Sequence, residues 1–150
     1  MIERSYVMVE PEFSQYGAVI REVIKRLQNA DMKIVDSALV RYFKEDAREH
    51  YSALVNKPFY PELEAYITSD IVFGMIVEGE NAIETIRTIV GATKNPAPGT
   101  IRHDIPKGMG LELRLMENVV HASDSVESAK KEIEVYQRLV DQKYNELERF

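Results

Sequence analysis

The chain has 150 residues, 45% of them hydrophobic and 29% charged, which fits one globular domain with a single core. Its net charge of −6 argues against a dedicated nucleic-acid binder, although an acidic protein can still carry a locally positive nucleotide pocket. The absence of cysteine excludes a disulfide framework and thiol chemistry. No run approaches the ~20 apolar residues of a membrane span, and the N-terminus lacks a signal-like stretch, so we expect a soluble, cytoplasmic protein without a membrane partner.

The first half of the chain predicts two strands and three helices. A β-rich run stops at Glu10-Pro11, a sequence that suits the end of a strand. The next apolar residues recur at steps of three and four, which indicates an amphipathic helix. In chain order, the expected elements are a strand at 5–9, a helix at 15–28, a strand at 33–40, a helix at 44–55 and a short helix at about 63–67.

The second half begins with an almost wholly apolar strand at 71–77, as expected of a central strand. Asn81 is a plausible N-cap for a helix that reaches about residue 90. The proline- and glycine-rich stretch 91–110 is expected to be one long irregular loop, a kind of segment that is usually functional. A short strand at 118–121 then leads to Ser125, the predicted N-cap of a last helix that extends almost to the C-terminus.

The alternation of four strands with helices sets the expected fold class. A four-stranded antiparallel sheet covered by helices, the ferredoxin-like split βαβ arrangement of α+β proteins, fits this order. A small parallel α/β sheet fits the pattern nearly as well, so both remain open at this point.

One histidine stands out because of its surroundings. His121 ends a short apolar run and is followed by hydroxyl and carboxyl side chains at Ser123 to Ser125. Imidazole is largely neutral near pH 7 and can act as a nucleophile, and an acidic partner such as Glu132 can fix its tautomer. An isolated histidine would more often simply fill the end of a strand.

Three segments of the chain together carry a family resemblance. They are His50-Tyr51 with Lys57-Pro58-Phe59-Tyr60-Pro61, the loop Gly91-Ala92-Thr93-Lys94-Asn95-Pro96-Ala97-Pro98-Gly99-Thr100-Ile101-Arg102-His103-Asp104, and Asn118-Val119-Val120-His121-Ala122-Ser123-Asp124-Ser125. In this order, they resemble the nucleoside diphosphate kinase family over roughly residues 3 to 135. The resemblance implies a kinase domain at 1–135 with a C-terminal helical extension of the same domain at 136–150. It also implies a homo-oligomer, a hexamer or a tetramer.

The resemblance further implies catalytic roles for four side chains. His121 would carry a phosphoryl group between nucleoside tri- and diphosphates, in two half-reactions of a ping-pong scheme. Glu132 would hydrogen-bond the imidazole, Ser123 would support the same arrangement, and Tyr51 would lie near the nucleophile.

Five more side chains would bind the nucleotide. Phe59 would stack on the base, and Asn118 would contact the sugar hydroxyl. Arg87, Thr93 and Arg102 would contact phosphate oxygens, which suits the planar guanidinium of arginine. Mg²⁺ would arrive with the nucleotide and need no metal ligand from the protein. His50 and His103 receive no role and are expected at the surface.

The sequence departs from the family pattern at Glu10. The family usually has Lys-Pro-Asp at the end of its first strand, where this chain has Glu10-Pro11-Glu12. At ~4 Å and an effective dielectric constant of ~20, a carboxylate facing a phosphate would cost about 4 kcal/mol. Glu10 could turn away, bind magnesium or pair with a basic residue, or another cation could replace the lysine; candidates are Lys94, Lys107 and Arg114.

Two further features leave alternatives open. The segment 105–117 is longer than its counterpart in the family, so no base contact is inferred from it. The apolar stripe of Tyr136, Val140, Tyr144 and Leu147 could pack on its own domain or on another subunit. With Glu10 in mind, the alternative to an active kinase is a nucleotide-binding regulatory protein of the same family; a structural or nucleic-acid-binding role has little support in an acidic chain.

Overall fold

The computed structural model describes residues 1–111 and 118–148. The strands in this part of the chain form one sheet in the order β2-β3-β1-β4, and each neighbouring pair is antiparallel. The antiparallel ferredoxin-like α+β fold is therefore confirmed, and a parallel sheet is excluded. The strands are β1 (Ile2–Val9), β2 (Lys33–Val40), β3 (Val72–Glu80) and β4 (Val120–Ala122).

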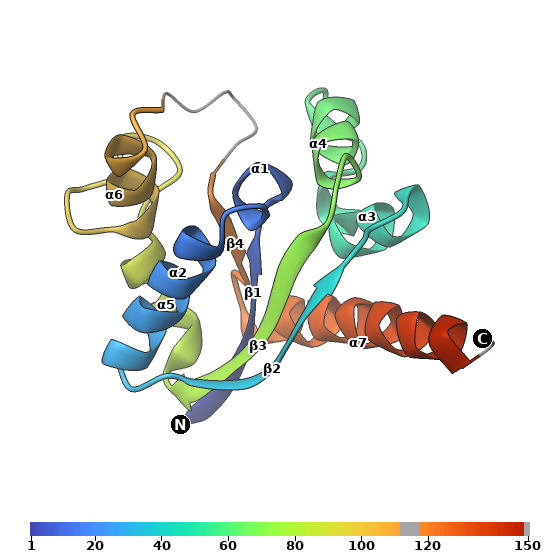
Figure 1. The fold of residues 1–150 in the computed structure, drawn as a ribbon, viewed down its shortest axis with the longest axis horizontal. Helices are drawn as coiled ribbons and strands as arrows, with labels where there is room; N and C mark the ends of the chain where they lie inside the picture. Colours follow the sequence, from blue (N-terminus) through green and yellow to red (C-terminus); the bar gives the residue numbers. More distant parts are fainter. Residues whose placement is uncertain (112–117, 149–150) are drawn as a thin grey trace.

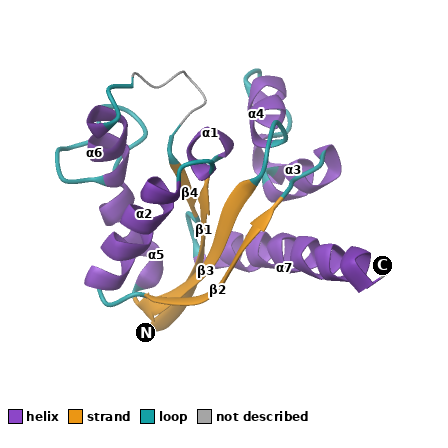
Figure 2. Ribbon diagram, viewed as in Figure 1, coloured by secondary structure: helices purple, strands orange, loops and turns teal. Residues whose placement is uncertain are grey.

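Helices lie against both faces of the sheet (Figures 1 and 2). One face carries α2, α5 and α6, and the other carries α3, α4 and α7. A short helix, α1, follows β1 directly. The helical segments are α1 (Pro11–Ser14), α2 (Gly17–Asn29), α3 (Lys44–His50), the 3-10 turn η1 (Ser52–Leu54), α4 (Tyr60–Ile67), α5 (Ala82–Val90), α6 (Ile101–Gly108) and α7 (Val126–Glu148).

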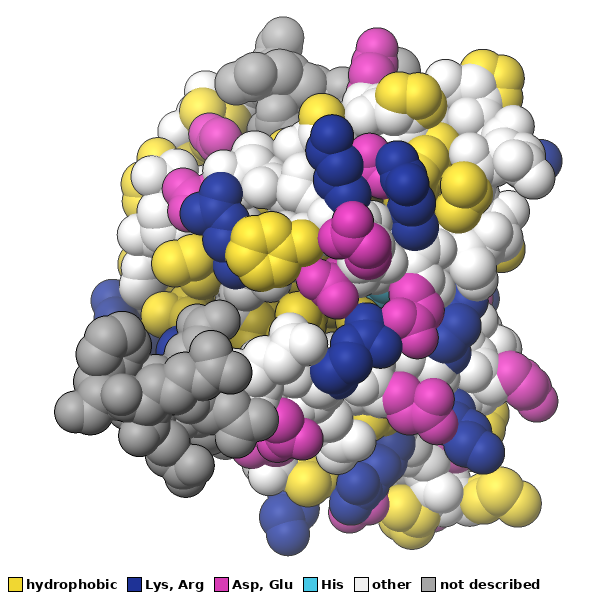
Figure 3. All heavy atoms as spheres, turned by 90° about the vertical axis from the view of Figure 1, so that its right-hand side faces the viewer, with side chains coloured by type: hydrophobic (Ala, Val, Ile, Leu, Met, Phe, Trp, Pro, Cys, Tyr) yellow, Lys and Arg dark blue, Asp and Glu magenta, His cyan; other side chains and the backbone are white. Residues whose placement is uncertain are grey.

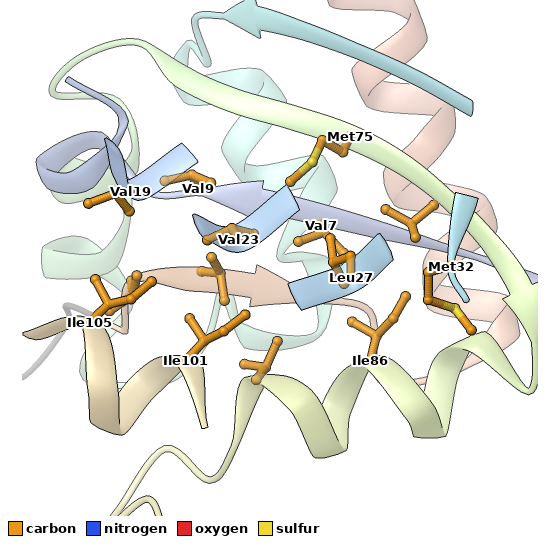
Figure 4. Packing of buried hydrophobic residues seen from close by; sticks show 14 of the residues in the cluster. Val7, Val9, Val19, Val23, Leu27, Met32, Met75, Ile86, Ile101 and Ile105 are labelled. Atoms are coloured by element: carbon orange, nitrogen blue, oxygen red, sulfur yellow. The ribbon is translucent and has the colours of Figure 1, made fainter. Parts of the chain in front are cut away.

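The sheet has one hydrophobic core on each of its two faces. Successive side chains of β1 point to opposite faces, so Val7 and Val9 join one cluster and Tyr6 and Met8 the other. Figure 4 shows the first cluster, in which side chains from β1, β3, α2, α5 and α6 meet. Because both faces are covered, the central strands β1 and β3 bury side chains on both sides, and the apolar run 71–77 is the central strand that its sequence predicted.

Three expectations about the elements were wrong in detail. The stretch 91–110 is not irregular throughout, because α6 occupies its second half. Ile101 and Ile105 lie one turn apart on the buried side of α6, and this packing outweighs the breaking tendency of Pro106 inside the helix. The sequence reading also missed α1, and the helix expected at 44–55 ends at His50 and gives way to η1.

The C-terminal helix α7 runs without a break across residue 135. Val135, Tyr136 and Leu139 are buried in the second core, against β1 and β2. This part of the apolar stripe packs on its own domain, whereas the side chains of Tyr144 and Leu147 lie outside the described residues.

Two surface properties bear on partners. Among the described helices, none combines the length and apolarity needed to cross a membrane. On the face drawn in Figure 3, Lys and Arg side chains are interspersed with Asp and Glu side chains. That face is therefore unlike the continuous basic surface of a nucleic-acid binder.

Candidate active site

The backbone around β4 presents His121 at the edge of the sheet. His121 pairs with Met8 of β1, and the carbonyl of Val119 accepts a hydrogen bond of 2.9 Å from the Glu10 backbone N–H. Val119 has a φ of +68°, and for a β-branched residue this left-handed conformation costs about 1–3 kcal/mol. Its full burial and the pairing of β4 with β1 hold this conformation, which turns the chain into β4 just before His121.

A chain of hydrogen bonds fixes the imidazole of His121. Its Nε2 lies 2.6 Å from Oε1 of Glu132, and the same oxygen accepts a hydrogen bond of 2.9 Å from the Ser123 hydroxyl. The Ser123 Oγ in turn accepts a hydrogen bond of 2.9 Å from the backbone N–H of Tyr6. Ser123 and Glu132 are buried, so β1, β4 and α7 together set the orientation of the ring.

His50 is not a surface residue, contrary to the expectation from the sequence. Its side chain is only 3% exposed, and its ring lies 4.6 Å from that of His121 and 4.3 Å from that of Tyr51, centroid to centroid. Tyr6 and Tyr42 complete this aromatic cluster and are linked by a hydrogen bond of 2.8 Å between their hydroxyls. The third histidine, His103, is half-buried on α6, where its Nδ1 lies 2.8 Å from Oδ1 of Asp104.

A cavity of about 1060 Å³ opens beside His121. It wraps around the edge strand β4 and is bounded by α3, η1, α5, the loop before α6, and α7. Of the residues with predicted roles, it brings together Tyr51, Arg87, Thr93, Arg102, His121 and Glu132. A cavity of this size accommodates a molecule as large as a nucleotide.

Arg102 is tied to the backbone around the cavity. Its three guanidinium nitrogens donate to the carbonyls of Gly91, Asn118 and Val120, at 2.8, 3.3 and 3.0 Å. Burial lowers the pKa of Arg102, and Arg87 adds to this, while the carboxylates of Glu10 and Asp124 act in the opposite direction. A guanidinium has five N–H donors, so two remain for a ligand.

The sequence reading missed three charged residues of the cavity wall, Glu84, Asp124 and Lys131. Lys131 precedes Glu132 on α7 and places its Nζ 2.6 Å from Oγ of Ser52. Asp124 follows the histidine segment and also lines the cavity. Lys131 lies one helical turn from Ser128, another lining residue, so the two share a face of α7, but only the packing of α7 places that face at the cavity.

Two predicted nucleotide contacts do not line this cavity. Phe59 is 39% exposed in the turn before α4, and Asn118 is half-buried at the start of the β4 segment. Neither Lys94 nor Lys107, two candidate replacements for the missing lysine, lines the cavity, and Arg114 lies outside the described residues, as does most of the second half of 105–117.

Glu10 is buried, with 4% of the residue exposed, and it does not line the cavity. Its Oε1 accepts a hydrogen bond of 2.8 Å from the backbone N–H of Asn118.

Burial raises the pKa of the Tyr51 hydroxyl well above its usual value, and the carboxylates of Glu10 and Glu132 add to the effect. Tyr51 therefore keeps its proton at neutral pH.

The fold recurs in a known class of phosphotransferases. Solved structures with the same fold include a nucleoside diphosphate kinase from Halobacterium salinarum in complex with CDP, which has a TM-score of 0.80 and 36% sequence identity and covers 91% of this chain and 88% of that one. An Aquifex aeolicus nucleoside diphosphate kinase gives a TM-score of 0.78 with 30% identity, covering 91% of this chain and 95% of that one.

The sequence comparisons narrow this class to a family. The family model for nucleoside diphosphate kinase matches residues 3–139. The nucleoside diphosphate kinase of Symbiobacterium thermophilum is 46% identical over 147 residues, covering 96% of this chain and 93% of that protein. The enzyme of Archaeoglobus fulgidus is 46% identical over 138 residues, covering 90% and 86%. The chain belongs to the nucleoside diphosphate kinase family.

Replacing Ser123 with alanine tests the hydrogen-bond chain behind His121. The Ser123→Ala variant leaves the buried N–H of Tyr6 without its side-chain acceptor and Glu132 without one donor. We expect the free energy of unfolding to fall by about 1–3 kcal/mol in urea titrations. Ser37→Ala, at an exposed position of β2, is the control and should change stability by less than about 0.5 kcal/mol. Equal effects of the two substitutions would contradict this account.

Proposed function

We propose that His121 accepts the terminal phosphoryl group of a nucleoside triphosphate and then passes it to a nucleoside diphosphate. The observation that carries this proposal is the bond of 2.6 Å between Nε2 of His121 and Glu132, beside a cavity whose wall carries Arg87, Arg102 and Lys131. An ionised carboxylate can only accept a hydrogen bond, so the proton resides on Nε2. The lone pair then resides on Nδ1, and Nδ1 is the nucleophile.

The first half-reaction follows from this tautomer. The Nδ1 lone pair attacks the terminal phosphorus, the bond from that phosphorus to the bridging oxygen breaks, and the nucleoside diphosphate leaves with the bonding electrons. The imidazole ring gains positive charge, which the Glu132 carboxylate stabilises at 2.6 Å. The second half-reaction is the reverse, with a different diphosphate as acceptor, which makes the scheme ping-pong.

Positive side chains on the cavity wall support the binding of phosphates. Arg87, Arg102 and Lys131 approach the cavity from α5, α6 and α7, and Thr93 offers a hydroxyl from the loop between α5 and α6. Lys131 is a cation on the α7 side that the sequence reading did not consider as a substitute for the missing lysine. Phosphoryl transfer depends mainly on such positioning and charge neutralisation.

Mg²⁺ fits this site as a partner of the nucleotide. The ion prefers oxygen ligands and keeps several waters, and the lining carboxylates of Glu84 and Asp124 could meet such a hydrated ion. When bound to the phosphates, Mg²⁺ neutralises part of their negative charge. Phe59 and Asn118 remain proposed contacts of base and sugar, and a hexamer or a tetramer remains the proposed assembly.

Glu10 does not argue against transfer, because its carboxylate is engaged by the Asn118 N–H and lies outside the cavity lining. The alternative of a nucleotide-binding regulatory protein with weak or no transferase activity rested mainly on this residue. We infer that Glu10 serves the site structurally, by fixing the start of the β4 segment that carries His121.

A labelling experiment tests the kinase proposal. After incubation with Mg²⁺ and ATP that carries a radioactive terminal phosphate, the protein should retain an acid-labile, base-stable label. The label should be lost in His121→Ala and kept in His103→Ala, the matched control on α6. Adding unlabelled nucleoside diphosphate should release it as triphosphate. Nucleotide binding without any label would contradict the proposal.

A charge reversal at Glu10 tests the structural role of this carboxylate. In Glu10→Lys, a buried ammonium replaces the acceptor of the Asn118 N–H, so we expect a loss of about 3 kcal/mol of stability and slower labelling of His121. The control Glu10→Gln keeps an acceptor oxygen and should cost only about 1 kcal/mol. Faster labelling of Glu10→Lys at unchanged stability would instead mean that Glu10 impairs the enzyme.

A further inference from the structure

The transfer reaction leaves one buried residue of the site without a role. His50 is almost fully buried, and neither of its ring nitrogens has a hydrogen-bond partner among the described residues. Burial lowers the pKa of His50 well below its usual value, and His121 and Lys131 add to this, so the ring is neutral and keeps a lone pair. A buried polar group without a partner is costly, which makes His50 a candidate for binding a ligand.

A ring nitrogen of His50 lies close to two other metal-binding groups. One ligand atom each from His50, His121 and Glu132 can be chosen so that all three lie within 4.8 Å of one another. The two imidazoles meet edge to face, and all three side chains border the same cavity, which gives an ion a path of entry. The residues come from α3, β4 and α7, three elements whose positions the sheet and its second core fix.

We propose that His50, His121 and Glu132 form a binding site for Zn²⁺ and that the bound ion withdraws His121 from phosphoryl transfer. Two imidazoles and one carboxylate are a zinc ligand set that leaves a fourth position open to the cavity. Mg²⁺ is not expected at this position, because it prefers oxygen ligands whereas imidazole favours later first-row metals.

Zinc binding would change the spacing of the three ligand atoms. Ligand bonds of about 2.0–2.2 Å in a tetrahedral site place ligand atoms about 3.3 Å apart. An ion on Nε2 of His121 would therefore widen the contact of 2.6 Å to Glu132, and the His50 ligand atom would lie closer than the present limit of 4.8 Å.

The effect on transfer rests on the proposed function of His121 and follows from its tautomers. A metal ion on Nε2 displaces the proton shared with Glu132, and a neutral ring then carries its proton on Nδ1, which loses its lone pair. A metal ion on Nδ1 occupies the nucleophilic lone pair directly. Zn²⁺ on either nitrogen leaves His121 unable to accept a phosphoryl group.

Metal binding is measured first, without nucleotide. Zn²⁺ is titrated into the full-length protein with Mg²⁺ in excess, by calorimetry and by competition with a chromogenic chelator. We expect one strong site per chain, weakened about tenfold or more in His50→Gln and unchanged in the control His103→Gln. Equal affinities in wild type and a folded His50→Gln, or the absence of a strong site, would overturn the proposal.

Cobalt provides a second readout that does not depend on whether the variant folds. Co²⁺ added to the wild-type protein should give the intense visible bands of a four- or five-coordinate site, and one equivalent of Zn²⁺ should remove them. Bands typical of six-coordinate hydrated Co²⁺ alone would contradict the predicted coordination.

The consequence for transfer is measured by the rate of His121 labelling at increasing free Zn²⁺. Labelling of the wild type should slow in proportion to zinc occupancy and recover when a chelator is added, and half-inhibition of His50→Gln should require at least tenfold more Zn²⁺. If zinc binds as predicted but the zinc-free protein takes no label, the proposed function fails and the metal site stands. If labelling proceeds unchanged with zinc bound, the inhibitory part of the inference is wrong.

Discussion

The hydrogen bond between Nε2 of His121 and Glu132 is the interaction on which the rest of the site depends. In the proposed mechanism it decides which nitrogen holds the proton, and it places a carboxylate where positive charge would develop during transfer. The bond exists only because α7 packs across the sheet at the point where β4 pairs with β1. Ser123 connects the same carboxylate to the backbone of Tyr6, 117 residues away in sequence. The orientation of the His121 ring thus depends on how the whole fold brings β1, β4 and α7 together.

The basic side of the cavity is built into the same framework. Arg102 donates to carbonyls on both the loop after α5 and the segment that leads into β4, so it holds together the two walls that a phosphate would meet. Glu10 secures the second wall from the end of β1, through the N–H of Asn118. The net charge of the chain is negative, but the fold places positive side chains together on the cavity wall. An acidic protein can therefore present a site for phosphate.

Much of the fold follows from the sequence because strand alternation and helical periodicity are local properties. The strand 33–40 was predicted with its observed limits, and Ser125 caps α7 through a hydrogen bond of 3.0 Å to the Ser128 N–H. Helix α6 was missed because the prolines and glycines of the stretch 91–110 suggest a loop, whereas burial of Ile101 and Ile105 decides its structure. Asn81 precedes α5 as predicted, yet adopts a φ of +48° and makes no side-chain cap.

Residues of the candidate site that belong to a sequence motif could be predicted from the sequence. Residues that only tertiary packing brings to the site could not. His121, Glu132 and Ser123 lie near one another in sequence, and the structure joins them as expected. His50 is different, because its burial beside His121 results from the docking of α3 onto the second core, which no local pattern reports. The position of Lys131 on the cavity wall likewise follows from the packing of α7, not from a local sequence pattern.

The ring nitrogen that carries the phosphoryl group reports directly on the hydrogen bond between His121 and Glu132. Phosphoenzyme formed with Mg²⁺ and ATP would be digested in base, and the phosphohistidine isomers separated and compared with standards. Because Glu132 holds Nε2, the account predicts Nδ1-phosphohistidine from His121. Phosphate on Nε2, or on a residue other than His121, would contradict the account.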